Sequence, residues 1–245
     1  TPWSPIWLKA VDGISLTLRA GESLGVVGAS GCGKSTLCRA LMGLNTIRGG
    51  RVDLLGQDLL NLRGEALRTA RRALQMVFQE PLACLNPALQ VADAIADPLL
   101  IHGLCSKAAA REEARRLLER VGLSPAEQFQ DRLPKQLSGG QQQRVAIARA
   151  LALKPKVLIC DESVSMLDAE VQADVLALLR ELQQELGLAI VFITHDLSVA
   201  SGFCHRVMVL DKGKVVEEGP GDRIFSAPQA AITRTLVEAC PRLPR

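Results

Sequence analysis

The stretch Gly28-Ala29-Ser30-Gly31-Cys32-Gly33-Lys34-Ser35-Thr36 decides the fold of this 245-residue chain. It fits the pattern G-x-x-x-x-G-K-[ST] of a phosphate-binding loop. An apolar run at 24–27 precedes it as a predicted strand, and 37–42 follows it as a predicted helix. Glycines let such a loop turn tightly, and backbone N–H groups at the helix start face an anion. The stretch therefore predicts a strand, a phosphate-binding loop and a helix in succession.

Two side chains of this loop carry chemistry that packing does not require. Lys34 brings a positive charge within reach of the outer phosphates of a nucleotide. Ser35 offers a hydroxyl to Mg²⁺, an ion that keeps several waters and takes few protein ligands. The alternative is a glycine-rich turn that binds nothing, but a Lys-Ser pair at a helix start has no packing purpose. We therefore favour nucleotide binding by this loop.

The composition argues against several other classes of protein. The formal net charge is only +3, and aromatic residues make up 3% with no Tyr, so a dedicated nucleic-acid binder with a base-stacking platform is not indicated. None of the seven cysteines forms a C-x-x-C pair, which predicts neither a zinc site nor a disulfide framework. Scattered thiols of this kind are typical of a reducing cytoplasm. No apolar run approaches the roughly 18 residues that span a bilayer.

Strands and helices alternate along most of the chain. Apolar runs predict strands at 52–55, 74–78, 157–160 and 189–193, a hairpin over 205–216 that turns at Asp211-Lys212-Gly213, and strands within 8–20, where apolar residues alternate. Helical patterns cover 62–73, 91–101, 106–121, 142–153 and 168–186. No strong strand lies between 80 and about 152. We expect a mostly parallel sheet covered on both faces, with a helical insertion.

Two carboxylates, Asp161 and Glu162, follow the apolar strand at 157–160. Ligands of parallel sheets bind at the carboxyl ends of the strands. Asp161 is therefore placed to hold Mg²⁺ beside the phosphate loop, and Glu162 to polarise an attacking water. Two solvated acids at a strand end need no function by themselves. Because a phosphate loop lies upstream in the same chain, a catalytic role for the two carboxylates is the better interpretation.

The run Leu137-Ser138-Gly139-Gly140-Gln141 leads into the predicted helix at 142–153. Ser138 is a good N-cap, and two glycines at a helix start leave N–H groups open to a second anion. An ordinary capped helix is the alternative, but Ser-Gly-Gly-Gln is far more specific than a glycine pair. The chain thus has two anion-binding helix starts separated by a helical insertion, and we expect each to be half of a site.

Single polar residues stand at the ends of other predicted elements. His195 ends a core strand on the same sheet edge as Asp161, which favours a γ-phosphate contact over a structural role. His205 keeps a structural interpretation. Gln79 also ends a core strand and is a candidate ligand for water or metal. Asp168 suits the N-cap of the next helix, and it is also a candidate for a contact across a subunit boundary.

In this order the motifs resemble the ATP-binding subunit of an ABC transporter, and the resemblance covers nearly the whole chain. It implies an α/β fold of the P-loop NTPase class, with a mostly parallel sheet, N-terminal antiparallel strands and an inserted helical subdomain. A single ABC ATPase domain would cover 1–245. Within it, 1–79 and 153–245 would form the ATP-binding core, and 80–152 the helical subdomain with the Leu-Ser-Gly-Gly-Gln motif.

The same resemblance implies ATP and Mg²⁺ as cofactors and assigns roles to residues. The implied catalytic residues are Glu162, His195 and Gln79, and the implied metal contacts are Ser35, Gln79 and Asp161. The implied nucleotide contacts are Gly28, Ala29, Ser30, Gly31, Cys32, Gly33, Lys34, Ser35 and Thr36, with Ser138, Gly139, Gly140, Gln141 and Asp168.

Partners follow from the resemblance as well. Two ATP-binding subunits, identical or homologous, would bind head to tail, with each ATP between one phosphate loop and the partner's Leu-Ser-Gly-Gly-Gln motif. Gln79 and the helical part would contact transmembrane permease subunits at the cytoplasmic face of the inner membrane. A substrate-binding protein would be an indirect partner, and nucleic acid would not be one.

The chain departs from the family pattern in two places. The family usually stacks adenine on an aromatic residue before the phosphate loop, and only Trp3 and Trp7 are available here. After Glu162 many members have Pro-Thr, whereas this chain has Ser163-Val164. The second departure leaves both carboxylates intact and bears only on the subfamily.

Local features resemble subunits of oligopeptide and nickel importers. They are the Val-Ser pair at 164–165, the run at 169–176 and the tail at 224–236. We therefore expect a bacterial importer of peptides, with nickel slightly less favoured. The alternatives are a soluble ABC-type ATPase acting on DNA or ribosomes, the ATPase of an exporter, and a non-hydrolysing nucleotide-binding partner.

Overall fold

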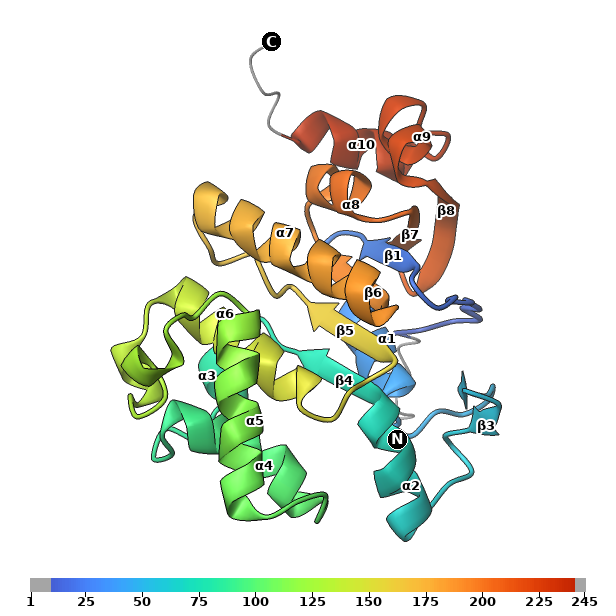
Figure 1. The fold of residues 1–245 in the computed structure, drawn as a ribbon. Coiled ribbons are helices and arrows are strands. Elements are labelled where there is room, and N and C mark those ends of the chain that lie inside the picture. The colour runs from blue at the N-terminus through green and yellow to red at the C-terminus, as the bar shows by residue number, and fades with distance from the viewer. Residues whose placement is uncertain (1–9, 241–245) are drawn as a thin grey trace, which may run out of the picture.

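The computed structural model describes residues 10–240 and contains a six-stranded sheet in the order β4-β5-β6-β1-β7-β8 (Figure 1). The strands are β1 Ser23–Val27, β4 Leu74–Val77, β5 Val157–Asp161, β6 Ala189–Thr194, β7 Arg206–Asp211 and β8 Lys214–Pro220. From β4 to β7 neighbouring strands run parallel, and β8 pairs antiparallel with β7. The predicted α/β fold with a mostly parallel sheet is confirmed.

Helices cover both faces of this sheet. They are α1 Lys34–Leu41, α2 Gly64–Ala70, α3 Pro81–Cys84, α4 Val91–Ile101, α5 Lys107–Arg120, α6 Gly139–Leu151, α7 Ala169–Leu186, α8 Leu197–Phe203, α9 Gly221–Ser226 and α10 Ala231–Ala239, with 3-10 turns η1 Arg71–Ala73, η2 Ala126–Gln128 and η3 Pro134–Gln136. The sequence did not predict α8, because seven residues are too few for a helical period. The local signal was Asp196, which caps α8 by accepting hydrogen bonds from the N–H groups of Ser198 and Val199.

The N-terminal region differs from the expected strands. Residues 11–20 alternate between half-buried and exposed, as predicted, and the half-buried apolar side chains pack on the sheet. Within the described part of 8–20, however, they form no hydrogen-bonded ladder. The antiparallel pair of this region is instead β2 Asp53–Leu54 with β3 Gln57–Asp58. Trp3 and Trp7 lie outside the described residues, so the structure does not test them as adenine contacts.

Alternation along the central strands divides the apolar core between the two faces of the sheet. In β6, Ile190 and Phe192 pack with α7 and α8, whereas Val191 and Ile193 pack with α1 on the other face. All four side chains are at most 2% exposed. Backbone hydrogen bonds pair the parallel strands β1, β5 and β6, so their ends lie at one level. The burial of both faces fixes this register, because a slip would move each side chain to the other face.

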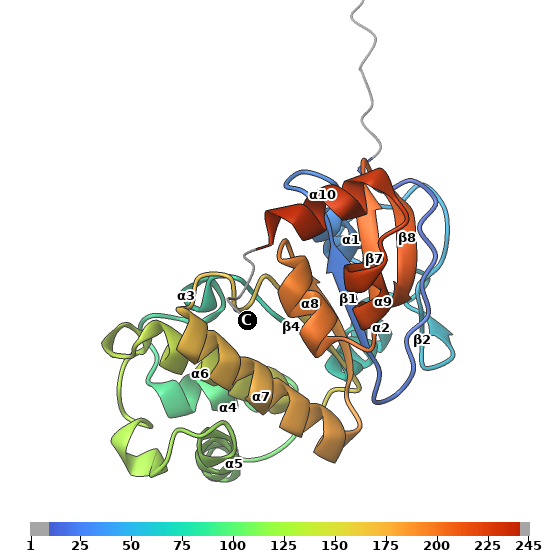
Figure 2. The ribbon, with the colours of Figure 1, turned by 90° about the horizontal axis from the view of Figure 1, so that it is seen from above.

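Between β4 and β5 the chain forms only helices and turns, and α4, α5 and α6 lie together beside the sheet (Figure 2). Apolar side chains of α4, α5 and α6 are buried against one another. We propose that this segment, 80–152, is a helical subdomain inserted into a core formed by 1–79 and 153–245.

One carboxylate of the sheet accepts hydrogen bonds from the segment that begins the C-terminal helix α10. Glu217 in β8 accepts hydrogen bonds from the N–H groups of Gln229 and Ala230, at 2.8 and 2.9 Å. Burial by itself would raise the pKa of Glu217. The nearby Thr233 hydroxyl and the two N–H groups outweigh that effect, so this pKa lies below its ordinary value.

We predict that Glu217→Ala lowers the free energy of unfolding by about 1 kcal/mol at neutral pH, as for loss of a helix cap. Because the folded-state pKa is depressed, this contribution is present above the unfolded-state pKa and disappears as pH falls through the folded-state value. Urea titrations at several pH values measure it. Glu238→Ala, on the exposed side of α10, is the control. Equal effects of the two variants, or a difference that persists in acid, would contradict the prediction.

Candidate functional site

The loop at 28–36 turns from the buried strand β1 into α1, and two of its glycines leave no room for a side chain. A Cβ at Gly28 would lie 2.3 Å from the carbonyl oxygen of Leu210, and one at Gly33 would lie 2.1 Å from that of Ala10. Gly33 also has φ 111°, a region that favours glycine. The loop is therefore clamped between neighbouring segments, and its first helical turn faces outward.

Lys34 lies inside this loop, and its side chain curls back over the loop backbone. Nζ donates hydrogen bonds to the carbonyl oxygens of Gly28, at 2.7 Å, and Ala29, at 3.1 Å. The residue is 6% exposed. A buried ammonium whose hydrogen bonds go only to neutral carbonyls favours an added anion, because no ion pair within the described residues offsets its desolvation.

A second segment supports the loop from outside, and no sequence pattern predicted this contact. Gly213, in the turn between β7 and β8, donates its N–H to the carbonyl oxygen of Cys32, at 2.9 Å. Its own carbonyl accepts the N–H of Asp12, at 2.7 Å. The Asp-Lys-Gly turn was predicted as a hairpin, but its contact with the phosphate loop is long-range.

Asp161 ends β5, close enough to Lys34 and Arg39 for their charges to act on it. Burial and the neighbouring Glu162 raise the pKa of Asp161, while the two cations oppose that shift. Oδ1 of Asp161 is buried and has no hydrogen-bond partner. An orphaned carboxylate oxygen beside a phosphate loop fits a hard cation such as Mg²⁺, which prefers oxygen ligands.

Glu162 and His195 meet at the ends of β5 and β6. Oε2 of Glu162 lies 3.2 Å from Nδ1 of His195. Glu162 has φ 47°, an uncommon value for a residue with a Cβ, and its N–H is tied to the carbonyl oxygen of Ile193 at 2.9 Å. Strained backbone of this kind is often found at functional sites. Here it aims the carboxylate at the imidazole and the sheet edge.

Strand register brings the other residues of this edge to the same level. Val77 of β4 is paired with Cys160 of β5, so Gln79 lies level with Glu162, and its side chain is exposed. Ser35 is exposed at the first turn of α1. The structure thus gathers the phosphate loop, Asp161, Glu162, Gln79 and His195 at one edge.

The Leu-Ser-Gly-Gly-Gln run forms the start of α6, with Ser138 as the predicted N-cap. Ser138 Oγ accepts the N–H of Gln141, and Oε1 of Gln141 accepts the N–H of Ser138, which makes a capping box. A Cβ at Gly140 would lie 2.4 Å from Cγ1 of Val171 at the start of α7. Asp168 caps α7, as predicted, by accepting the N–H of Val171 at 3.0 Å.

The structure does not join the two predicted anion-binding helix starts within one chain. Among residues 10–240, no hydrogen bond or ion pair connects the loop at 28–36 with Ser138–Gln141. Figure 2 shows α6 with the helices of 80–152, and α1 and β1 with the sheet. The phosphate loop and the start of α6 are therefore separate surfaces of the monomer.

Comparisons with known proteins identify this arrangement. The family model described as "ABC transporter" matches residues 11–165. The chain is 46% identical over 238 residues to the oligopeptide transport ATP-binding protein OppF of Salmonella typhimurium, covering 97% of this chain and 71% of that protein. It is 48% identical over 236 residues to the dipeptide transport ATP-binding protein DppF of Escherichia coli K12, covering 96% and 70%.

Solved structures agree with these matches. The ATP-binding cassette MJ0796, as a dimer in a post-hydrolysis state bound to ADP and Pi, matches with TM-score 0.79 and 33% identity over 90% of this chain and 94% of its own. The cbiO1 protein of Clostridium perfringens, part of the ABC transporter complex cbiONQ, matches with TM-score 0.80 and 30% identity over 89% and 84%. The chain therefore belongs to the ABC transporter family, among its ATP-hydrolysing subunits.

Proposed function

We propose that this chain hydrolyses ATP at the edge formed by β1, β5 and β6 and thereby drives the import of peptides. The observation that carries the proposal is the pairing of Glu162 with His195 at 3.2 Å, beside the orphaned oxygen of Asp161 and the phosphate loop with Lys34. A base, a cation ligand and a phosphate cradle at one edge are the parts that phosphoryl transfer to water requires.

Each residue has a distinct role in this proposal. Lys34 and the N–H groups of the loop bind the outer phosphates and stabilise charge that develops on them. Glu162 orients the attacking water and accepts its proton. His195 holds the Glu162 carboxylate in position and contacts the γ-phosphate, while Gln79 contributes to the same edge.

The residues present fit Mg²⁺. Ser35 Oγ and Asp161 Oδ1 would hold it, with Gln79 as a further contact. The ion supplies charge neutralisation at the phosphate oxygens when bound. Its site is assigned from the chemistry of these donors and from the buried oxygen of Asp161 that has no hydrogen-bond partner.

The separation of the phosphate loop from Ser138 supports a composite site made by two subunits. Ser138, Gly139 and Gly140 present the start of α6 at a surface distinct from Lys34. In a head-to-tail pair this surface would close over the ATP of the partner, with Asp168 at the same boundary. The dimeric state of the matched cassette MJ0796 supports the arrangement.

Peptide cargo is supported by the relatives, because OppF and DppF are described as oligopeptide and dipeptide transport proteins. No helix within residues 10–240 is long and apolar enough to cross a membrane. We infer that the chain binds permease subunits at the cytoplasmic face of the inner membrane, through Gln79 and the helices of 80–152. A substrate-binding protein delivers the cargo, and nickel is the second candidate.

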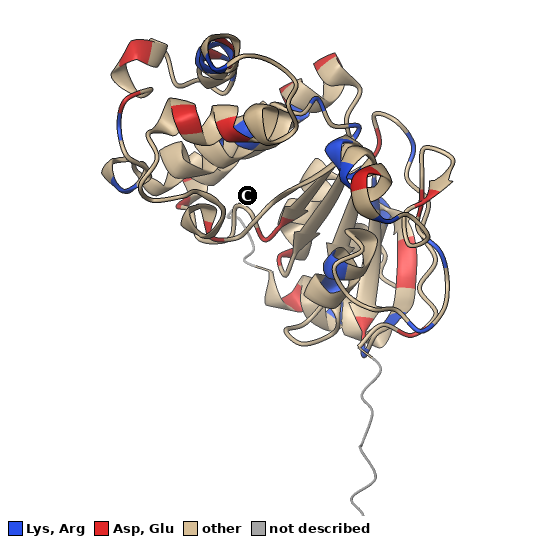
Figure 3. Cartoon of the chain, turned by 90° about the horizontal axis from the view of Figure 1, so that it is seen from below, with Lys and Arg blue, Asp and Glu red and all other residues tan. Residues whose placement is uncertain are grey.

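The alternative of an ATPase that acts on nucleic acid has less support. Lys and Arg are interspersed with Asp and Glu along the described ribbon (Figure 3), and the formal net charge is +3. A nucleic-acid binder concentrates basic residues in a patch or stripe, because phosphate contacts dominate its affinity.

We predict separable defects for Lys34→Ala and Glu162→Gln. Lys34→Ala loses nucleotide binding, because the phosphates lose a direct positive contact. Glu162→Gln keeps binding but loses turnover by at least about a hundredfold, because an amide accepts no proton from water. Nucleotide affinity and steady-state ATPase rate are the measurements. Lys107→Ala, at the exposed start of α5, controls for a change of charge alone. Normal turnover by Glu162→Gln would remove Glu162 as the base.

We predict that Ser138 acts on the ATP held by the other subunit. Ser138→Arg and Lys34→Ala chains are each inactive alone, but mixed dimers regain one intact site and a measurable fraction of the wild-type ATPase rate. Analytical ultracentrifugation verifies that pairs have formed. With an obligate different partner, the substitutions are divided between the two proteins. ATP hydrolysis by a verified monomer would contradict the proposal that two subunits form each site.

For cargo, we predict that deleting the gene abolishes uptake of labelled dipeptides and oligopeptides, and that the wild-type gene restores it while the Glu162→Gln gene does not. Nickel uptake in the same cells is the comparison. Unchanged uptake of peptides, in a strain without a redundant importer, would defeat the peptide assignment and leave ATP hydrolysis untouched.

A further inference from the structure

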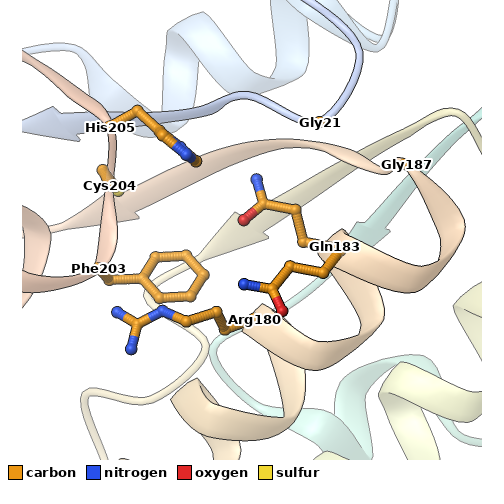
Figure 4. A pocket seen from close by; sticks show the side chains of 8 residues that line it. Gly21, Arg180, Gln183, Gly187, Phe203, Cys204 and His205 are labelled. Atoms are coloured by element: carbon orange, nitrogen blue, oxygen red, sulfur yellow. The ribbon is translucent and has the colours of Figure 1, made fainter.

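A cavity of about 280 Å³ opens at the end of the sheet opposite the phosphate loop. It lies between the C-terminal end of α7 and the segment that joins α8 to β7, with Gly21 closing one side (Figure 4). Ligand pockets usually enclose roughly 300 to 1,000 Å³, so its size suits a small molecule. Because Gly21 and His205 precede β1 and β7, the cavity belongs to the amino ends of the strands and shares no residue with the proposed ATP site.

A buried polar group in the cavity wall has no partner. Gln183, in the last turn of α7, is 4% exposed, and its Nε2 has no hydrogen-bond partner. Burying an amide donor without a partner is unfavourable, so such groups are rare. Gln183 therefore places an unsatisfied amide donor in the wall of the cavity.

His205 contributes a further donor, and its tautomer follows from its neighbours. The backbone N–H of Ser23 donates to Nδ1 of His205 at 3.1 Å, and Ser23 Oγ lies 2.6 Å from the same atom. A backbone N–H can only donate, so Nδ1 carries no proton and the neutral ring carries it on Nε2. The ring projects into the cavity (Figure 4), which makes Nε2–H available there.

Arg180 adds a positive charge to the residues that line the cavity. Its guanidinium lies 5.7 Å from the centre of the Phe203 ring and donates one hydrogen bond, at 2.9 Å, to the carbonyl oxygen of Gly202. Among the ion pairs of residues 10–240, none includes Arg180. The other N–H donors of Arg180 therefore form no ion pair with a carboxylate of the described residues.

We propose that this cavity binds small molecules that carry a carboxylate, which accepts hydrogen bonds from Arg180, Gln183 and His205. The lining includes a guanidinium, an unpartnered amide donor and an imidazole N–H, so an anion rich in acceptors complements these three groups. A planar carboxylate matches the fork of a guanidinium in two parallel hydrogen bonds. The Phe203 ring beside the donors suits an apolar or aromatic body attached to the carboxylate.

Sodium benzoate is the probe, and neutral benzamide, with the same ring, is its matched control. We expect benzoate to shift the amide resonances of 180–187 and 203–205 of the ¹⁵N-labelled full chain saturably, and benzamide to bind at least about tenfold more weakly, since hydrogen bonds to charged groups are the stronger ones. Nucleotide is left out, so the result does not depend on ATP hydrolysis.

Variants separate binding from a structural role. We expect Arg180→Gln and Gln183→Leu each to weaken benzoate binding about tenfold or more, while Glu181→Gln, on the exposed face of α7, leaves it within about twofold. Gln183→Leu removes an unpartnered buried amide, so its melting temperature should equal or exceed that of the wild type. A purely structural glutamine would instead make this variant melt earlier.

Three outcomes would overturn the proposal: no saturable shift with benzoate, equal binding of benzamide, or shifts confined to the phosphate loop. The first two need only the wild-type chain, so they decide the matter even if a variant fails to fold.

Discussion

The hydrogen bonds from Lys34 to the carbonyl oxygens of Gly28 and Ala29 are the contact on which the proposed site depends. They hold an ammonium, 6% exposed, at the centre of a loop that faces no carboxylate within ion-pair distance in the described chain. Such a charge is costly to bury. The close contacts at Gly28 and Gly33 keep the loop from relaxing around it. The loop is thus arranged to bind an anion before any nucleotide arrives.

Strand register extends this constraint to the proposed catalytic groups. β1 and β5 both pair with β6, so the loop after Val27, the carboxylates after Cys160 and the imidazole after Thr194 reach one edge from distant parts of the sequence. A slip of one residue would turn the buried side chains of β6 to the wrong faces. The catalytic geometry is therefore protected by the same apolar burial that stabilises the sheet.

Local sequence patterns predicted the features that a short stretch of sequence determines. The apolar runs gave the strands, the caps Ser138 and Asp168 gave two helix starts, and the phosphate-loop motif gave the turn into α1. Contacts between distant segments were not predictable. The contacts of Leu210 and Gly213 with the phosphate loop, and the cavity that Gln183 and His205 both line, involve residues whose sequence neighbours show no pattern. Apolar and polar side chains alternate along residues 11–20 as they do in a strand. This alternation indicates which side chains are buried, but it does not show that the segment pairs with another strand.

The packing of Gly140 against Val171 links the two half-sites that one chain would contribute to a dimer. The segment from Glu162 to Val171 begins at the proposed catalytic carboxylate, where the N–H and Oγ of Ser165 donate hydrogen bonds to the carbonyl oxygen of Glu162, and it ends against Gly140 at the start of α6. With so little room at Gly140, a shift of this segment must move Ser138 as well. In the proposed dimer, a change at one subunit's own ATP would therefore be felt, through direct contact, at the ATP of its partner.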